Sequence, residues 1–255
     1  MRKASLLIFS VALSVSALAT INSSKALFIK NSLDNLKEYI LTTKQNSFLG
    51  NTYSVDEIYT DYANNELAAN KKYKDKDLRI KTTINQVKED VFGNAFIIAK
   101  IKSSVIGGAH FKVNEKDPLI LELSKNSNVD LVCRFDEYSL DSLSFNQCLF
   151  TDQFANKLLD PLKVRLLKFD EENYKPQSKV EVILSALPYA FPENAINEVC
   201  ENDAKNCSME KITTSKFFPK TISKEPINLD QYADTLIDKY GKEWFKSLPK
   251  FPTAE

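Results

Sequence analysis

The chain has 255 residues with 34 basic and 34 acidic side chains, so its formal net charge is zero at pH 7. A chain with balanced charge has no global field for gathering polyanions, which argues against a general nucleic acid-binding protein. Its length suits one large domain, or one domain with an appendage. Five glycines are few for an all-β protein of this size, and this scarcity predicts some helix.

The first 20 residues, MRKASLLIFSVALSVSALAT, have the three-part layout of a secretory signal peptide. Arg2 and Lys3 precede an uncharged apolar run at residues 4–18, and small residues follow. This run is shorter than the roughly 20 residues that a membrane-spanning helix needs. We predict cleavage after Ala19, with Ala26 as the second candidate. The mature protein is then periplasmic or secreted and has no transmembrane segment.

Helices are expected before the first strand. One helical segment is predicted at residues 27–49, and the SVDE sequence at residues 54–57 is a capping box that opens a second helix running to Tyr73. Four cations, Lys71, Lys72, Lys74 and Lys76, fall at the end of this second helix, where they complement the helix dipole.

The hydrophobic period then changes from 3.6 to 2. Residues 78–87 alternate apolar with polar side chains, which predicts a half-buried strand with Arg79 and Lys81 on its water-facing side. Further strands are predicted at residues 95–101, 119–123, 129–135, 162–169 and 179–187, and a helix at residues 144–159. This order of elements is expected of an OB-fold barrel with an added N-terminal helix.

Residues 62–94, YANNELAANKKYKDKDLRIKTTINQVKEDVFGN, resemble the opening of the tRNA-anticodon-domain-like (tRNA_anti-like) OB-fold family of secreted bacterial proteins. In that family a helix ending in Asn-Glu-x-x-Ala-Asp-x-x-Tyr-x-Gly-Lys enters the first strand. The matching residues are Asn65, Glu66, Ala69, Tyr73 and Lys76, and the departures are Asn70, Asp75 and Thr82. The resemblance covers residues 54–135 and extends more loosely to 187. It implies the fold and a packing role for Tyr73, and almost nothing about activity.

The predicted fold class is therefore mainly β with flanking helices (α+β). It is an OB-fold five-stranded barrel with N-terminal helices and a C-terminal amphipathic helix. The predicted division is a signal peptide at 1–19, an N-terminal helical segment at 20–53, an OB-fold domain at 54–187, and a disulfide loop with a C-terminal helix extension at 188–255. The helix expected at residues 227–248 has an apolar stripe that docks on the barrel or the N-terminal helix. In the alternative interpretation, Trp244 and Phe245 are anchors for a partner.

Four cysteines follow the predicted signal peptide, and their even number indicates two disulfides formed in an oxidising compartment. Three pairings are possible. A local bridge between Cys200 and Cys207 would close a short polar loop and leave Cys133 for Cys148, and these are the pairs we predict. The Cys spacings do not resemble those of a zinc site, so no metal or other cofactor is expected.

Residue patterns typical of catalysis are scarce. His110 is the only histidine, so any Ser-His-Asp or Cys-His arrangement would have to use it. No Gly-rich phosphate loop is present. We therefore predict a non-catalytic binding module rather than an enzyme, with another protein or an envelope component as its partner.

Two alternatives remain open. The basic stretch at residues 71–81 could bind single-stranded nucleic acid, with Tyr73 as a stacking platform. We disfavour it because lysines at a helix end and on the outer side of a strand are usually solvated. Carboxylate groups such as Asp170, Glu171 and Glu172 could serve a cryptic hydrolase.

Overall fold

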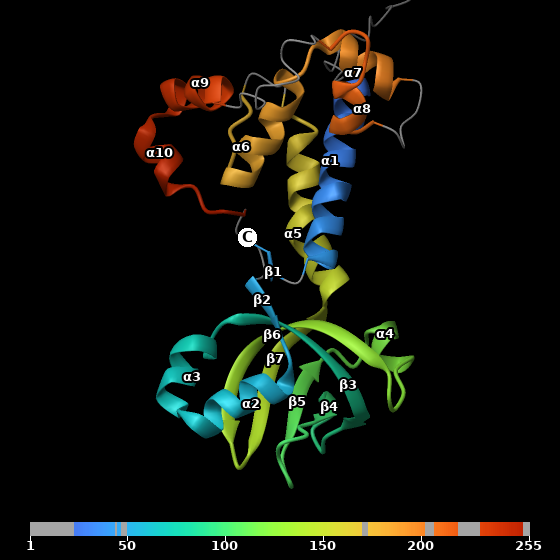
Figure 1. The fold of residues 1–255 in the computed structure, drawn as a ribbon, viewed down its shortest axis with the longest axis vertical. Coiled ribbons are helices and arrows are strands. Elements are labelled where there is room, and N and C mark those ends of the chain that lie inside the picture. Colours follow the sequence, from blue (N-terminus) through green and yellow to red (C-terminus); the bar gives the residue numbers. More distant parts are fainter. Residues whose placement is uncertain are drawn as a thin grey trace, which may run out of the picture.

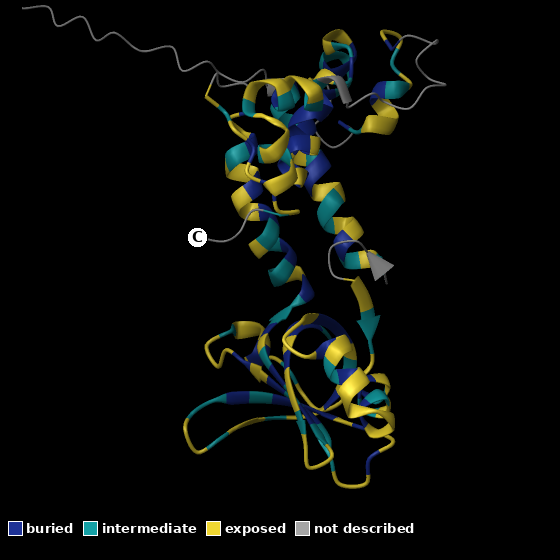
Figure 2. Ribbon diagram, turned by 90° about the vertical axis from the view of Figure 1, so that its left-hand side faces the viewer, coloured by how far each residue is buried: buried dark blue, intermediate teal, exposed yellow. Residues whose placement is uncertain are grey.

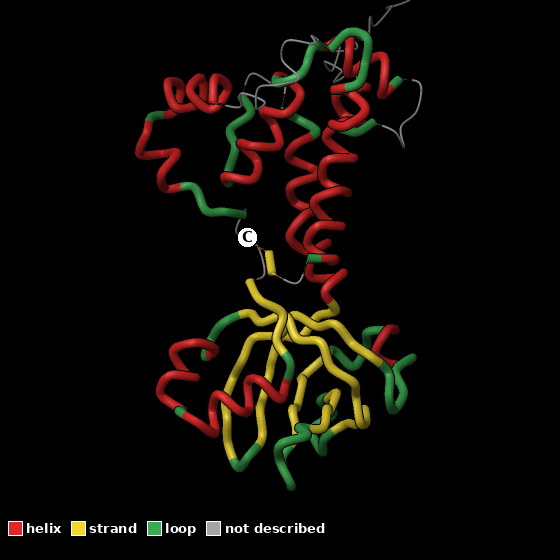
Figure 3. The backbone as a smooth tube through the Cα atoms, viewed as in Figure 1, coloured by secondary structure: helices red, strands yellow, loops and turns green. Residues whose placement is uncertain are grey.

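The computed structural model describes residues 23–43, 45–46, 50–169, 173–201, 207–218 and 230–251, so the predicted signal peptide lies outside the described residues. The described chain forms a β-barrel and a bundle of helices, stacked along the long axis of the molecule (Figure 1). Strands gather in one of these units and most helices in the other (Figure 3). No described helix is long and apolar enough to cross a membrane.

Five strands close the barrel: β3 (Asp77–Glu89), β4 (Ala95–Lys100), β5 (Gly108–Val113), β6 (Asn128–Ser139) and β7 (Ser142–Phe150). Strand β3 pairs with β6 through its first half and with β4 through its second half. The ring continues from β4 to β5, from β5 to β7 in parallel, and from β7 to β6. This closed order is that of an OB-fold and confirms the predicted fold class.

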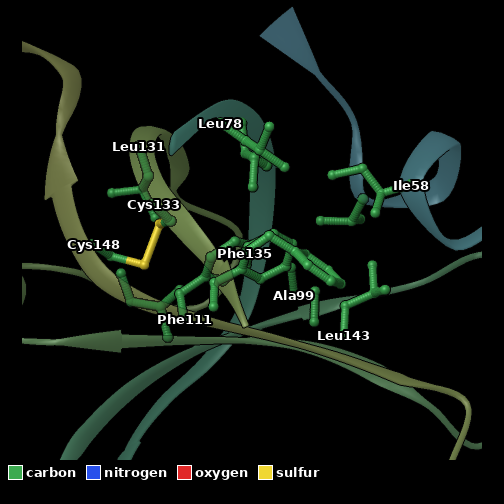
Figure 4. Close-up of a cluster of buried hydrophobic side chains, with 14 of the residues drawn as sticks. Ile58, Leu78, Ala99, Phe111, Leu131, Cys133, Phe135, Leu143 and Cys148 are labelled. Atoms are coloured by element: carbon green, nitrogen blue, oxygen red, sulfur yellow. A yellow bond between two sulfur atoms is a disulfide. The ribbon is translucent and has the colours of Figure 1, made fainter. Parts of the chain in front are cut away.

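The barrel core is built from alternating residues of all five strands. Phe111, Leu131 and Phe135 are fully buried, and they point into the same interior (Figure 4). The predicted disulfide between Cys133 and Cys148 is present there and joins β6 to β7. Strand β5 was not predicted, because its sequence follows two glycines and resembles a loop.

The ends of the barrel carry short helices and strands. Helix α2 (Val55–Asn64) begins at the predicted cap, where the Ser54 Oγ accepts a hydrogen bond from the Glu57 amide at 3.1 Å. The predicted single helix is two, because Asn65 ends α2 and its side chain caps α3 (Glu66–Tyr73). Strand β2 (Gly50–Tyr53) pairs with β3 and also with the short β1 (Gln45–Asn46), and α4 (Pro118–Leu121) follows β5.

Four element predictions in the second half of the barrel and beyond are wrong. Residues 119–123 contain α4 rather than a strand, and residues 144–159 contain most of β7 and the start of α5 (Thr151–Leu166) rather than one helix. Residues 162–169 belong mainly to α5. There Leu162, Leu166 and Phe169 are buried at helical spacing, whereas Val164 is 65% exposed. Residues 179–187 form α6 (Lys179–Ala186), whose apolar and polar residues are buried alike.

The helical unit has its own core. Helix α1 (Ser23–Thr42) runs toward the barrel and α5 runs away from it, so the two pack antiparallel (Figure 1). Four further helices of the described chain pack against this pair: α6, η1 (Leu187–Tyr189), α7 (Glu193–Cys200) and α8 (Met209–Thr213). The predicted Cys200–Cys207 disulfide is present between α7 and α8. Residues 151–187, which were predicted within the OB-fold domain, contain helices α5 and α6, and their apolar residues belong largely to this second core.

The predicted C-terminal amphipathic helix is divided in two. Gly241, with φ of 91°, separates α9 (Asp230–Tyr240) from α10 (Lys242–Ser247). The apolar stripe packs on Val182 of α6, not on the barrel or the N-terminal helix. Positive φ strains residues with a Cβ, so glycine ends the first helix here.

One buried arginine joins the two units. Arg79 of β3 was predicted to face water, but its side chain is only 2% exposed. Its guanidinium donates to the carbonyls of Ile40 at 2.9 Å, Thr43 at 3.1 Å and Leu41, all at the C-terminal end of α1. The carbonyls at a helix end have no partner within the helix, so a buried cation both satisfies them and opposes the negative end of the helix dipole.

The same guanidinium forms a bidentate pair with Asp130 of β6, at 2.9 and 2.7 Å. Asp130 also accepts a hydrogen bond from Thr151 Oγ1 at 2.7 Å, at the first residue of α5. Burial raises the pKa of Asp130, but the hydrogen bonds from Arg79 and Thr151 and the nearby cations outweigh it and hold this pKa below its usual value. The pair therefore links two barrel strands to the adjacent ends of α1 and α5.

Replacing Arg79 by Met is expected to lower the free energy of unfolding by about 3 kcal/mol or more, because it leaves Asp130 without its buried cation and several helix carbonyls without their donor. Urea unfolding at pH 7 measures the change. Lys81→Met is the matched control: Lys81 also contacts Asp130, at 3.2 Å, but is 52% exposed and should cost less than about 1 kcal/mol. Equal losses in both variants would contradict the role given to Arg79.

Acid is expected to weaken this junction. Because the folded-state pKa of Asp130 is lowered, its stabilisation is fully present above the unfolded-state value of about 3.9 and is lost as the pH falls through the folded-state pKa. The stability difference between the wild type and Asp130→Asn should therefore be largest at neutral pH and shrink near pH 3. If the stability difference stays constant between pH 7 and pH 3, the charge of Asp130 does not stabilise the junction.

Candidate functional site

The predicted basic site, Lys71, Lys72, Lys74 and Lys76, lies at the end of α3, and two of its cations are engaged within the fold. Lys72 Nζ lies 2.8 Å from Asp61 Oδ2 and 3.7 Å from Glu57 Oε1. Lys76 Nζ donates to the backbone carbonyls of Lys71 and Lys72 at 2.7 and 2.8 Å. Arg79 and Lys81 pair with Asp130. These contacts show that the basic residues in 71–81 stabilise the C-terminal end of α3 and the junction between the barrel and the helical unit.

Tyr73 is fully buried in the barrel core. Its ring packs between Tyr53 and Tyr62, and its hydroxyl donates to Asp61 at 2.6 Å. The hydrogen bonds from Lys72 and Tyr73 hold the pKa of Asp61 below its usual value. A ring without an exposed face cannot stack on a base in this conformation.

A different feature stands out at the end of the barrel remote from the helical unit (Figure 1). Two loops meet there, the β4–β5 loop and the β6–β7 hairpin. They carry three large aliphatic side chains that are almost fully exposed: Val105 at 100%, Ile106 at 82% and Leu140 at 92%. We call these three residues the apolar loop cluster.

The backbone holds the two loops together. A Cβ on Gly107 would lie 1.6 Å from the Asp141 carbonyl oxygen, so only glycine allows this approach. The Gly107 amide donates to Ser104 Oγ at 2.8 Å, and the Gly108 amide reaches Ser142 Oγ at 3.4 Å. The apolar loop cluster therefore belongs to one connected surface.

The hairpin turn is strained. Leu140 and Asp141 form its two-residue loop with φ of 48° and 57°, in the left-handed region. Such turns favour Asn-Gly, because a bulky side chain at positive φ costs of order 1–3 kcal/mol. An exposed leucine in this conformation contributes neither to the core nor to the turn, and strain of this kind concentrates at functional sites.

A second surface lies on the outer side of β3, β4 and β5. Phe96 is paired with Lys88 on one side and Lys112 on the other, and His110 lies opposite Ile98 one row away. We call Lys88, Phe96, His110 and Lys112 the basic face. Burial and the charge of Lys88 lower the pKa of His110, which keeps its imidazole neutral at pH 7. Asp90 lies at its edge, and hydrogen bonds from Asn94 lower the pKa of this carboxyl, with a smaller effect from Lys112.

The predicted anchors Trp244 and Phe245 are both half-buried beside the small cluster of Val182, Leu236 and Leu248. Asp170, Glu171 and Glu172 lie outside the described residues. Among the residues that the structure does describe, no group of three or more His, Cys, Asp or Glu side chains is arranged to hold a metal ion.

Sequence reasoning missed both barrel surfaces. In residues 95–100, Phe96 shares one side of the strand with Lys100, and this pairing of an aromatic residue with a cation was the available signal for the basic face. The Leu-Asp pair between two strands gave no turn signal, because it lacks the residues that such a turn favours.

Two comparisons with known proteins concern single chains, one with solved structures and one with curated proteins. One chain that this protein resembles is a "putative nucleic acid-binding lipoprotein" from Klebsiella pneumoniae subsp. pneumoniae MGH 78578. The match has 14% identity and a TM-score of 0.33, and covers 39% of this chain and 89% of that one. A likeness of this extent does not indicate what the present chain binds. No curated protein matches it at a significant level.

The model of the tRNA_anti-like family matches residues 1–149, which is more than half of the chain and includes all five barrel strands but not α5 and the later helices. The resemblance in the helix-to-strand segment is thus borne out across the barrel. The chain belongs to the tRNA_anti-like family.

Proposed function

We propose that this chain is a non-catalytic binding module of an extracytoplasmic compartment, and that its partner is another protein or a protein-bearing envelope component that docks on the apolar loop cluster. The single observation that carries the proposal is the exposure of three aliphatic side chains on two connected loops, one of them in a strained turn. Isolated exposed aliphatic residues are common, but a contiguous group is typical of an interaction surface.

The compartment is supported by the two disulfides, because structural disulfides persist in oxidising environments. The signal peptide remains part of the proposal. The domain division is also part of the proposal, and we revise it. The OB-fold domain ends near Phe150, and the described residues after it form a helical domain together with α1.

Site-specific photo-crosslinking tests the partner surface. A photoreactive amino acid at position 106 or 140, in protein expressed in its native envelope, is expected to give the same discrete adduct. The control position is Leu67, which is 84% exposed but lies alone on α3. Ile106→Asp with Leu140→Asp should remove the adduct formed from position 105 without changing the melting temperature by more than a few degrees. No adduct at 106 or 140, or the same adduct at 67, would refute the proposal.

A second candidate ligand is single-stranded nucleic acid on the basic face, instead of on residues 71–81. The row of Lys88, Phe96 and Lys112 favours it, because OB-folds that bind single strands combine cations with an aromatic ring, and Phe96 is half-buried rather than in the core. Phe96, His110 and Lys112 lie on the second and third barrel strands, where OB-folds commonly take oligonucleotides, and Lys88 lies on the first.

Binding of a labelled oligo-dT at low salt checks this candidate. If the face binds phosphates, Lys88→Gln with Lys112→Gln should reduce the slope of log K against log salt by about 1.4, which corresponds to two lost phosphate contacts. Phe96→Ala should weaken binding roughly tenfold or more. Lys71→Gln with Lys74→Gln is the matched control and should leave the slope unchanged. The absence of any complex at 20 mM salt would eliminate this candidate.

A further inference from the structure

A cleft of about 770 Å³ opens in the helical unit, far from both barrel surfaces. Three described segments form its walls. They are the last turn of α5 with Lys168, the segment at residues 173–177, and α10 together with Leu248 and Pro249. The volume lies within the range of sites that bind small molecules. Apolar Val164, Trp244 and Leu248 line it together with polar side chains, which suits a ligand with one polar and one apolar part.

The charges that line the cleft are positive. Among the lining residues that the structure describes, Arg165, Lys168 and Lys175 are cationic and none is acidic. Arg165 is neutralised by the fully buried Glu181, which also accepts a hydrogen bond from the Gln177 amide. Among the described lining residues, the two exposed lysines, Lys168 and Lys175, therefore supply the positive charge that no carboxylate neutralises.

An aromatic ring forms part of the opposite wall. Trp244 lines the cleft, and the ammonium of Lys175 lies 5.8 Å from the centre of its ring and 5.0 Å from that of Tyr240. Such cation–π contacts hold a lysine near the ring while its remaining hydrogen-bond donors stay available. A flat apolar group against Trp244 would thus lie beside a cation.

The walls are held in place by hydrogen bonds between segments far apart in sequence. The amides of Lys179 and Val180, at the start of α6, donate to the carbonyls of Pro249 at 2.9 Å and Lys250 at 3.2 Å. Tyr240 Oη donates to the carbonyl of Tyr174 at 3.0 Å. The cleft is therefore preformed, which reduces the entropy lost when a ligand binds.

We propose that this cleft binds a small organic anion, with its flat apolar part against Trp244 and its phosphate or carboxylate group within reach of Lys168 and Lys175. Phosphate and carboxylate groups would be bound in the same way, because each has anionic oxygens that accept hydrogen bonds from ammonium groups. This site is independent of the partner surface on the barrel.

Trp244 is the only tryptophan in the chain, so its fluorescence reports on the cleft alone. Titration of the full-length mature protein with 1-naphthyl phosphate and with 1-naphthoate is expected to change this fluorescence saturably, and the tighter of the two identifies the head group. The neutral 1-naphthalenemethanol should bind at least tenfold more weakly. Saturable binding of neither anion up to millimolar concentration, or equal binding of the alcohol, would overturn the proposal.

Lys168→Gln with Lys175→Gln should raise Kd at least tenfold, whereas Lys157→Gln, an exposed lysine of α5 outside the cleft, should leave it unchanged. The acidic residues 170–172 precede Asn173 in the sequence and lie outside the described residues. Replacing them with their amides should leave binding as tight or tighter, because the local field becomes more positive. Weaker binding in that variant, or no effect of the double lysine variant, would contradict an anion site.

Discussion

The two units depend on one ion pair in which the arginine is buried and the aspartate is partly exposed. Arg79 and Asp130 lie on neighbouring barrel strands, and between them they bind the C-terminal end of α1 and the first residue of α5. The signs are complementary, because the cation lies at the negative end of one helix and the anion near the positive end of the next. Both helices are thereby fixed to the barrel at the same point and leave it antiparallel. Helices α6, α7 and α8, with the disulfide between α7 and α8, share a core with this helix pair, and α9 and α10 pack in turn on α6.

The barrel was predictable from the sequence where pattern and context agree. Residues 78–87 alternate as a strand of a one-sided sheet should, and Ser54 caps a helix by a local hydrogen bond. Prediction failed where tertiary contacts override the pattern. The alternation also predicted that Arg79 faces water. Its partners are carbonyls at the end of α1, 36 to 39 residues earlier in the chain, and the sequence around Arg79 contains no signal for them. In residues 179–187, alternating Val180, Val182 and Leu184 suggested a strand, but a short helix buried on nearly every side gives the same pattern.

The candidate surfaces were harder to predict, for a different physical reason. A sequence shows where cations occur but not which of them already have partners. Lys72 and Lys76 bond within the α2–α3 region, whereas Lys88 and Lys112, which are separate in the sequence, are brought to either side of Phe96 by strand register. Exposure is likewise a tertiary property: Val105 and Ile106 differ from buried aliphatic residues only in where the loop places them. The yellow tips of the barrel loops in Figure 2 show how much of this end is uncovered.

The strained hairpin and the disulfide on the same two strands are energetically linked. Leu140 and Asp141 in a turn that favours Asn-Gly cost of order 1–3 kcal/mol, and the sequence gains nothing for the fold in return. The Cys133–Cys148 bridge joins β6 to β7 across a separation of 15 residues that contains this turn. A closed loop of that size stabilises the folded state by about 3 kcal/mol in the chain-entropy model, which is enough to offset the turn. The cross-link therefore permits a strained turn with an exposed leucine at its tip, a side chain that the barrel core does not use.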